Sequence, residues 1–206
     1  MKKLNYTLLA LVLACLTTAA SAQIGIGVRA GLTFSNINVD ADGADVEFNS
    51  RTGFVVGIPV EIRLPGPLGL QVEANYSQYG AKADFAGFET DDVINYLDIP
   101  VLLKAGLISD DFEASAVVGP SFGYALSGKS TFNGETEDIE FGDDDVRANI
   151  GLVFGAQGGL PVGAGKVTLD VRYNLGLNDL EDDDDDTKVT NRQFQVALGY
   201  LFTIGG

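Results

Sequence analysis

The segment that decides the fold is IGIGVRAGLTFS, residues 24–35. From its first isoleucine onward every second residue is apolar, and the residues between them are glycine, arginine, threonine or serine. Successive side chains of a β-strand point to opposite faces, so a period of two predicts a strand with one apolar and one polar face. Residues 52–64 repeat the pattern over a similar length.

Six further segments alternate in the same way. Eight strands are predicted in all, at residues 24–36, 52–64, 69–81, 95–106, 112–126, 146–160, 166–178 and 192–204. Short turns follow the second, fourth and sixth strands, whereas longer acidic connections follow the first, third, fifth and seventh. That asymmetry is typical of an eight-stranded antiparallel up-and-down transmembrane β-barrel, with short periplasmic turns and long acidic extracellular loops. We therefore predict an all-β fold, with residues 23–206 forming one outer-membrane β-barrel domain.

The N-terminal residues 1–22 have the features of a cleaved secretory signal peptide. Two lysines are followed by an apolar stretch too short to span a bilayer, and Ala20-Ser21-Ala22 offers a small-residue cleavage site. The predicted location is the outer membrane of a Gram-negative cell. Residues 12–15, which end in Cys15, resemble a lipoprotein cleavage box, so lipidation of Cys15 is an alternative.

The polar stripe of the predicted strands is rich in glycine and carries charges of both signs. A basic side chain facing lipid at mid-bilayer costs about 2–4 kcal/mol, so these charges are expected to face inward, where they can pair. The alternative is a soluble, lipocalin-like barrel with its apolar face inside. The predicted barrel-interior ion network consists of Arg29, Glu61, Arg63, Glu73, Asp98, Lys104, Glu113, Arg147, Asp170 and Arg172.

Composition excludes several classes of function. The chain has no histidine and one cysteine, which excludes catalysis or zinc binding that depends on imidazole. Its formal net charge of −16 argues against nucleic-acid binding, which needs clustered Lys and Arg. We expect no cofactor and no enzymatic activity.

Two runs of aspartate, Asp182 to Asp186 and Asp143 to Asp145, lie in the predicted long connections. Carboxylate oxygens suit Ca²⁺ and Mg²⁺, so divalent cations are candidate partners of these loops. A solvated, self-repelling loop tip is the alternative. No residue of the sequence is assigned as a metal ligand.

Several motifs together resemble a known family. They are YLDIPVLLK at residues 96–104, Gly119-Pro120, LDVRYNLGL at residues 169–177 and the closing LGYLF at residues 198–202. In this order they are similar to the PorT-like outer-membrane β-barrel domain common in Bacteroidetes. The resemblance implies an eight-stranded outer-membrane barrel, usually without an assigned biochemical activity. It also implies that Gly199, Tyr200 and Phe202 belong to a terminal signal that the barrel assembly machinery reads.

The function that these observations favour is that of an integral outer-membrane protein of structural or interaction type. Its expected partners are outer-membrane lipid and the assembly machinery, and its protein partner is unknown. A small-solute or cation-selective channel of the porin type is the first alternative. A soluble ligand carrier of the lipocalin type is the second.

Overall fold

The computed structural model describes residues 23–41, 44–47, 49–85, 88–109, 111–142, 146–180 and 187–204. The predictions for the signal segment 1–22 with Cys15, and for the aspartate runs at 143–145 and 182–186, lie outside these residues. In the part of the chain that is described, no helix is long and apolar enough to cross a bilayer.

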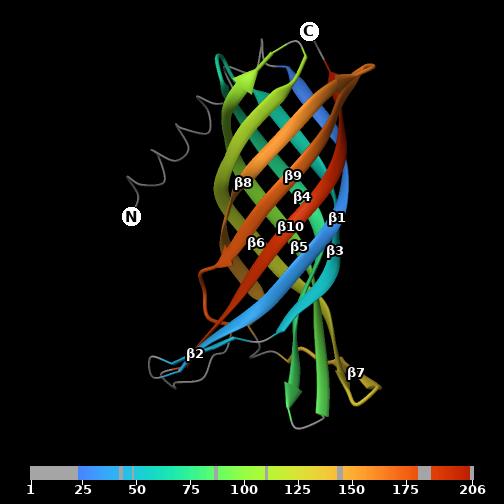
Figure 1. The fold of residues 1–206 in the computed structure, drawn as a ribbon, viewed down its shortest axis with the longest axis vertical. Helices are drawn as coiled ribbons and strands as arrows, with labels where there is room; N and C mark the ends of the chain where they lie inside the picture. The colour runs from blue at the N-terminus through green and yellow to red at the C-terminus, as the bar shows by residue number, and fades with distance from the viewer. Residues whose placement is uncertain are drawn as a thin grey trace.

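Eight long strands form a closed antiparallel barrel (Figure 1). They are β1 (Ile24–Ala41), β3 (Asn49–Arg63), β4 (Leu68–Phe85), β5 (Phe88–Ile108), β6 (Glu113–Phe132), β8 (Ala148–Val162), β9 (Gly165–Gly176) and β10 (Thr187–Ile204). Closure is made by β1 and β10, which pair from Ile24 opposite Ile204 to Ala41 opposite Thr187. The fold class predicted from the alternation is therefore confirmed.

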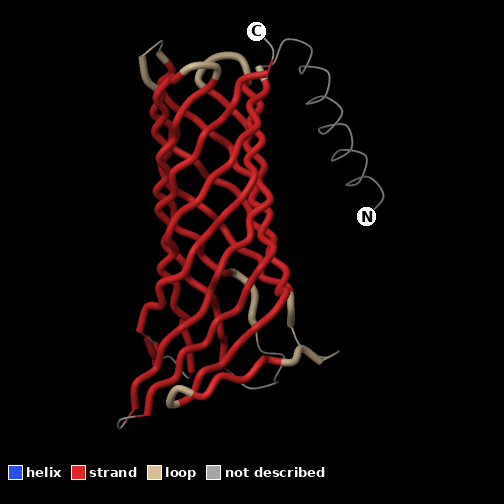
Figure 2. Tube along the Cα trace, turned by 90° about the vertical axis from the view of Figure 1, so that its right-hand side faces the viewer, coloured by secondary structure: helices blue, strands red, loops and turns tan. Residues whose placement is uncertain are grey.

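The two ends of the barrel differ. At one end, which we call the short-turn end, β3 leads to β4 through residues 64–67, β5 to β6 through residues 109–112, and β8 to β9 through residues 163–164. The C-terminal end of β10 lies at this end as well (Figure 1). At the other end, which we call the hairpin end, paired strands continue beyond the barrel wall (Figure 2).

Apolar side chains cover the outside of the barrel and polar ones fill the inside. Val28 and Leu198 are 60% and 61% exposed, whereas Arg29 and Glu73 are 4% and 1% exposed. The apolar stripe of β1 runs over residues 24–34, and at a tilt of about 40° it rises roughly 25 Å, the height of the apolar band of a membrane barrel. This orientation is the reverse of that in a soluble lipocalin-like barrel.

The strands extend further than the sequence predicted at the hairpin end. The connection predicted as a loop between residues 81 and 95 is mostly ladder, because β4 and β5 pair as far as Phe85 opposite Phe88. β7 (Glu135–Ile139) pairs with β6, and β2 (Ala44–Glu47) pairs with β1. Alternating hydrophobicity marks only the part of a strand that has lipid on one side. Beyond the lipid, water can reach both faces of a strand, so strand pairing continues there without alternating hydrophobicity.

The outward orientation predicts the effect of a charge on the lipid face. Leu198 lies near mid-height of the apolar stripe, opposite Ala30 and Leu169. Replacing it, Leu198→Arg, is expected to lower the free energy of unfolding from lipid vesicles by about 2–4 kcal/mol, because the guanidinium has no partner in hydrocarbon. Urea unfolding followed by tyrosine fluorescence measures this. Leu198→Phe is the control, and a loss no larger for arginine than for phenylalanine would contradict the assigned orientation.

Candidate functional site: the ion network inside the barrel

The central part of the lumen holds four charged side chains from three strands. The Glu73 carboxylate of β4 accepts hydrogen bonds from Arg29 of β1 and Arg172 of β9, both at 2.8 Å. Arg172 also pairs with Asp170, its neighbour on the same face of β9. These side chains are at most 2% exposed, and we call the four the central cluster. Two positive and two negative charges neutralise one another there, away from water.

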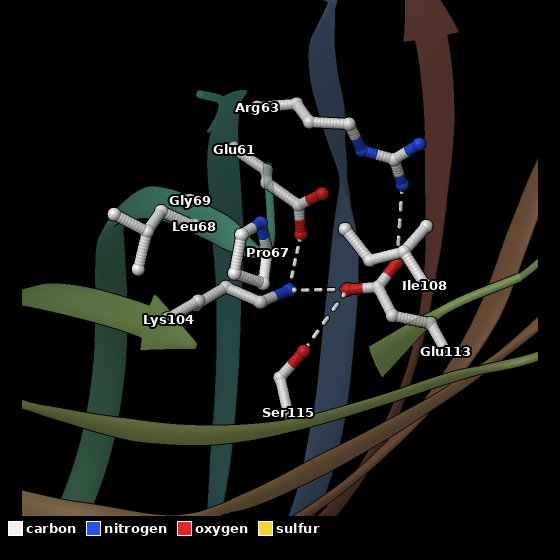
Figure 3. A pocket seen from close by; sticks show the side chains of 9 residues that line it. All are labelled: Glu61, Arg63, Pro67, Leu68, Gly69, Lys104, Ile108, Glu113 and Ser115. Carbon is white, nitrogen blue, oxygen red and sulfur yellow. Dashed lines mark hydrogen bonds and ion pairs between the residues drawn. The ribbon is translucent and has the colours of Figure 1, made fainter. Parts of the chain in front are cut away.

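A second group lies toward the short-turn end and forms a closed ring of ion pairs, which we call the ion ring. Lys104 of β5 contacts the carboxylates of Glu61 on β3 and Glu113 on β6, the latter at 3.2 Å. Lys166 of β9 contacts the same two carboxylates at 2.7 and 2.6 Å. Figure 3 shows Lys104 lying between Glu61 and Glu113. Of the four strands that the ring joins, only β5 and β6 are neighbours in the barrel wall, and so the ring spans the lumen.

Arg63 closes the outer side of the ion ring. Its guanidinium donates to Glu113 at 3.1 Å and to the side-chain oxygen of Gln23 at 3.3 Å. A third of its side chain remains exposed (33%), and Figure 3 shows it reaching toward Glu113 from the strand end. Arg63 is thus the interior charge nearest to solvent at the short-turn end.

One amide side chain joins the two groups into a single network. Gln157 of β8 accepts a hydrogen bond from Lys104 through its oxygen and donates to Asp170 at 2.8 Å through its nitrogen. Gln71 and Asn75 add donors to Glu73. Charges and amides therefore form a continuous hydrogen-bonded network from the short-turn end to the middle of the barrel.

Toward the hairpin end the filling becomes aromatic. Tyr79 and Tyr96 pack edge to face with ring centres 5.1 Å apart, and Asn174 donates to the Tyr79 hydroxyl at 2.6 Å. Asp98 lies in the same part of the lumen and accepts a hydrogen bond from Ser121. Asp98 is 2% exposed. The predicted residue Asp98 is therefore inside the barrel but outside the ion pairs of the central cluster.

Glycines on the polar stripe make room for the interior amides. A Cβ atom at Gly57 would stand 1.9 Å from the side-chain oxygen of Asn75, and one at Gly151 would stand 2.4 Å from that of Asn174. A side chain at either glycine would displace the buried amide opposite it. The glycines that the sequence places on the inward face are thus needed for close approach, as expected for a narrow, filled barrel.

Cavities at the short-turn end are small. One cavity of about 10 Å³ is lined by Glu61, Arg63 and Lys104, and another of about 20 Å³ by Arg63, Lys166 and Gln23. Each has room for about one water molecule. No group of three or more Asp, Glu, Cys or His side chains that could hold a metal ion occurs among the described residues.

Two differences separate the structure from the predicted interior set. Arg147 precedes β8 at the hairpin end, where its guanidinium donates to the carbonyl of Phe141 at 2.8 Å and stands 5.0 Å from the centre of that ring. It does not belong to the network, because β8 begins at Ala148 and not at residue 146 as predicted. Lys166 was missed. It is in phase with Thr168 and Asp170 on the inward face of β9, and that signal could have identified it.

The residues of the predicted assembly signal lie on the last strand. Gly199 is opposite Arg29 of β1 and Thr168 of β9, and Tyr200 donates its hydroxyl to the carbonyl of Val162 at 2.8 Å. Phe202 packs against Tyr200 with ring centres 4.6 Å apart and is half exposed on the outside. Recognition by the assembly machinery stays a prediction.

A closed barrel with an apolar exterior and an ionic interior defines the class of outer-membrane β-barrels. The chain belongs to the outer membrane protein beta-barrel domain family, whose model matches residues 19–182. No curated protein matches the chain.

Three solved structures with a similar fold share low sequence identity with this chain. Neisserial surface protein A, NspA, has a TM-score of 0.50 at 14% identity and covers 87% of this chain and 97% of its own. The outer membrane protease OmpT of Escherichia coli has 0.50 at 10%, covering 90% and 98%. The attachment invasion locus protein Ail of Yersinia pestis has 0.44 at 17%, covering 88% and 99%. At these identities the likeness concerns the fold alone.

Removing one charge from the central cluster should destabilise the barrel strongly. Glu73→Gln leaves Arg29 and Arg172 buried without their shared carboxylate, and a broken buried pair costs about 3–5 kcal/mol. We expect a fall of this size in the free energy of unfolding, measured by urea titration in detergent micelles. Glu137→Gln is the matched control, since Glu137 is exposed on β7. Equal losses of unfolding free energy in the two variants would contradict a stabilising role of the central cluster.

Proposed function

We propose that this protein is an integral outer-membrane barrel with a structural or interaction role and without catalysis. Residues 1–22 would direct its export and be removed, the short-turn end would face the periplasm, and the hairpin end would face the outside. Membership of the outer membrane protein beta-barrel domain family supports the location, and the apolar exterior supports lipid as the surrounding medium.

The observation that carries this proposal is the filled lumen. A water-filled channel would leave the side chains that line it accessible to solvent. Here Arg29, Glu73 and Arg172 are each at most 4% exposed, and Lys104 in the ion ring is 3% exposed. Every charge of the central cluster is held by an opposite charge on the same or another strand. The arrangement favours a rigid support for the hairpins over a passage for solutes.

We further assign the chain to the PorT-like barrels of Bacteroidetes, a finer placement than the family model gives. The motifs at residues 96–104 and 169–177 support it, because they supply Asp98, Lys104, Asp170 and Arg172 to the barrel interior. The barrel assembly machinery would read the end of β10, where Tyr200 and Phe202 face outward. Divalent cations at the two aspartate runs remain part of this proposal.

Conductance across planar bilayers tests the proposal against a channel function. The folded protein, identified by its shifted migration in unheated electrophoresis, is expected to give no stable single-channel currents, because the ion ring and the central cluster occupy the lumen. Glu61→Ala and Arg172→Ala serve as comparison variants.

Clear unitary currents in the unmodified protein would overturn the proposal. The conclusion would be strongest if Glu61→Ala or Arg172→Ala also changed the selectivity of those currents. Recovery of the protein from cells in the aqueous phase without detergent would contradict the membrane location itself.

A further inference from the structure

The short strand β7 has one free edge. It pairs with β6, and no other described strand pairs with it. In Figure 1 it lies at the margin of the hairpin end, beyond the barrel wall. All of its residues except Ile139 are exposed. A free strand edge carries unpaired N–H and C=O groups, to which another chain can add a strand.

The β6–β7 hairpin determines which backbone groups point to the free edge. Its turn consists of residues 133–134, whose φ angles of 49° and 88° are both positive, as in a type I′ turn. The pair that closes such a turn, Phe132 and Glu135, exchanges both of its hydrogen bonds, and hydrogen-bonded pairs recur at every second residue from there. The N–H and C=O groups of Thr136 and Asp138 therefore point away from β6.

These four outward groups have no partner in the described part of the chain. The β6–β7 ladder is the one described ladder that contains β7, and the backbone hydrogen bonds outside the ladders do not involve Thr136 or Asp138. Alternate residues of a strand are about 7 Å apart. An extended polypeptide segment has the same repeat, so its own N–H and C=O groups can pair with all four.

The side chains of β7 select the charge of such a segment. Glu135 and Glu137 project from one face of the strand, and Asp138 projects from the other. Asp138 lies 3.7 Å from Lys129 of β6, whereas no described residue forms an ion pair with Glu135 or Glu137. Two unpaired carboxylates two residues apart match a segment with lysine or arginine at every second position.

The same charges argue against a second copy of this chain as the occupant. If two β7 strands paired antiparallel through their free edges, Thr136 of each copy would pair with Asp138 of the other. The two Glu137 side chains would then be directly opposed, and like charges in that position destabilise a strand pair. Charge complementarity therefore favours a basic segment of a different protein.

We infer that the free edge of β7 binds, by strand addition, an extended polypeptide segment with lysine or arginine at every second position. Main-chain hydrogen bonds to Thr136 and Asp138 hold the segment, and its basic side chains pair with Glu135 and Glu137. These two glutamates occupy non-hydrogen-bonded positions toward the added strand, where opposed side chains approach most closely. The inference names a partner for the interaction role proposed above, and so it rests on that proposal.

The test is binding of three decapeptides to the folded protein in micelles of uncharged detergent, measured at low salt by isothermal titration calorimetry. The first peptide alternates lysine and threonine, and it is expected to bind with a dissociation constant of about 1 mM or below. The second has the same sequence with every backbone amide N-methylated. It keeps the charge but cannot donate to the edge, so it should bind at least about fivefold more weakly. The third alternates glutamate and threonine and should not bind.

Variants of β7 locate the binding. Thr136→Pro removes one outward N–H and no hydrogen bond to β6, and it should weaken binding of the first peptide by about fivefold. Thr136→Val keeps that N–H and is the matched control, with an expected change of less than about twofold. Combining Glu135→Gln with Glu137→Gln should weaken binding by about fivefold. Gel migration without heating verifies that each variant is folded.

Four results would overturn the inference: no binding of the first peptide, equal binding of its N-methylated form, equal loss in Thr136→Pro and Thr136→Val, or self-association of the protein that Thr136→Pro abolishes. Equal binding of the methylated form would mean that charge alone attracts the peptide, and the self-association would identify a second copy as the occupant. None of these results changes the expected absence of channel currents, so failure here is distinguishable from failure of the proposed barrel function.

Discussion

Hydrocarbon offers no hydrogen-bond partner to a charge or to an unpaired backbone group, and the rest of this structure depends on that constraint. Every strand edge must be paired, which is achieved when β1 meets β10 along their full length. Every charged side chain on a spanning segment must face inward. Because these inward charges have little water either, they must find one another, and the central cluster and the ion ring are the result.

The central cluster and the ion ring connect different strands at different heights of the barrel. The central cluster joins β1 and β4 to β9, so it connects opposite sides of the wall at mid-height. The ion ring joins β3, β5, β6 and β9 near the short-turn end, and Gln157 connects the two through hydrogen bonds. A barrel braced at two levels holds its strands in fixed relation. It can therefore carry the hairpins that extend beyond the barrel wall (Figure 2).

The sequence predicts the membrane-spanning parts of the strands and which of their faces points inward, and little else of the structure. Alternation over residues 24–35 identifies the strands and their inward face because a one-residue slip would expose charges to hydrocarbon. The same signal predicts nothing about the far part of the β4–β5 ladder, which continues to Phe85 opposite Phe88 without the alternation. The alternation of β8, extended back by two residues from position 149, predicts that Arg147 lies inside, whereas β8 begins only at Ala148. Lys166 is the opposite case. It is in phase with the inward residues of β9, but it lies at the very start of that strand, where the alternation is short. Which charges pair could not be predicted, since pairing joins strands far apart in sequence, as Arg29 and Glu73 do.

The chain contains no tryptophan, so a single introduced tryptophan reports its own surroundings without background. Phe122 on β6 is 51% exposed, and Tyr96 on the neighbouring β5 is 2% exposed. The most direct test compares Phe122→Trp with Tyr96→Trp in vesicles of brominated lipid, whose acyl-chain bromines quench indole fluorescence on contact. The account predicts strong quenching of the tryptophan at position 122 and little at position 96. Quenching at position 96 with none at position 122 would mean that the barrel has its faces reversed.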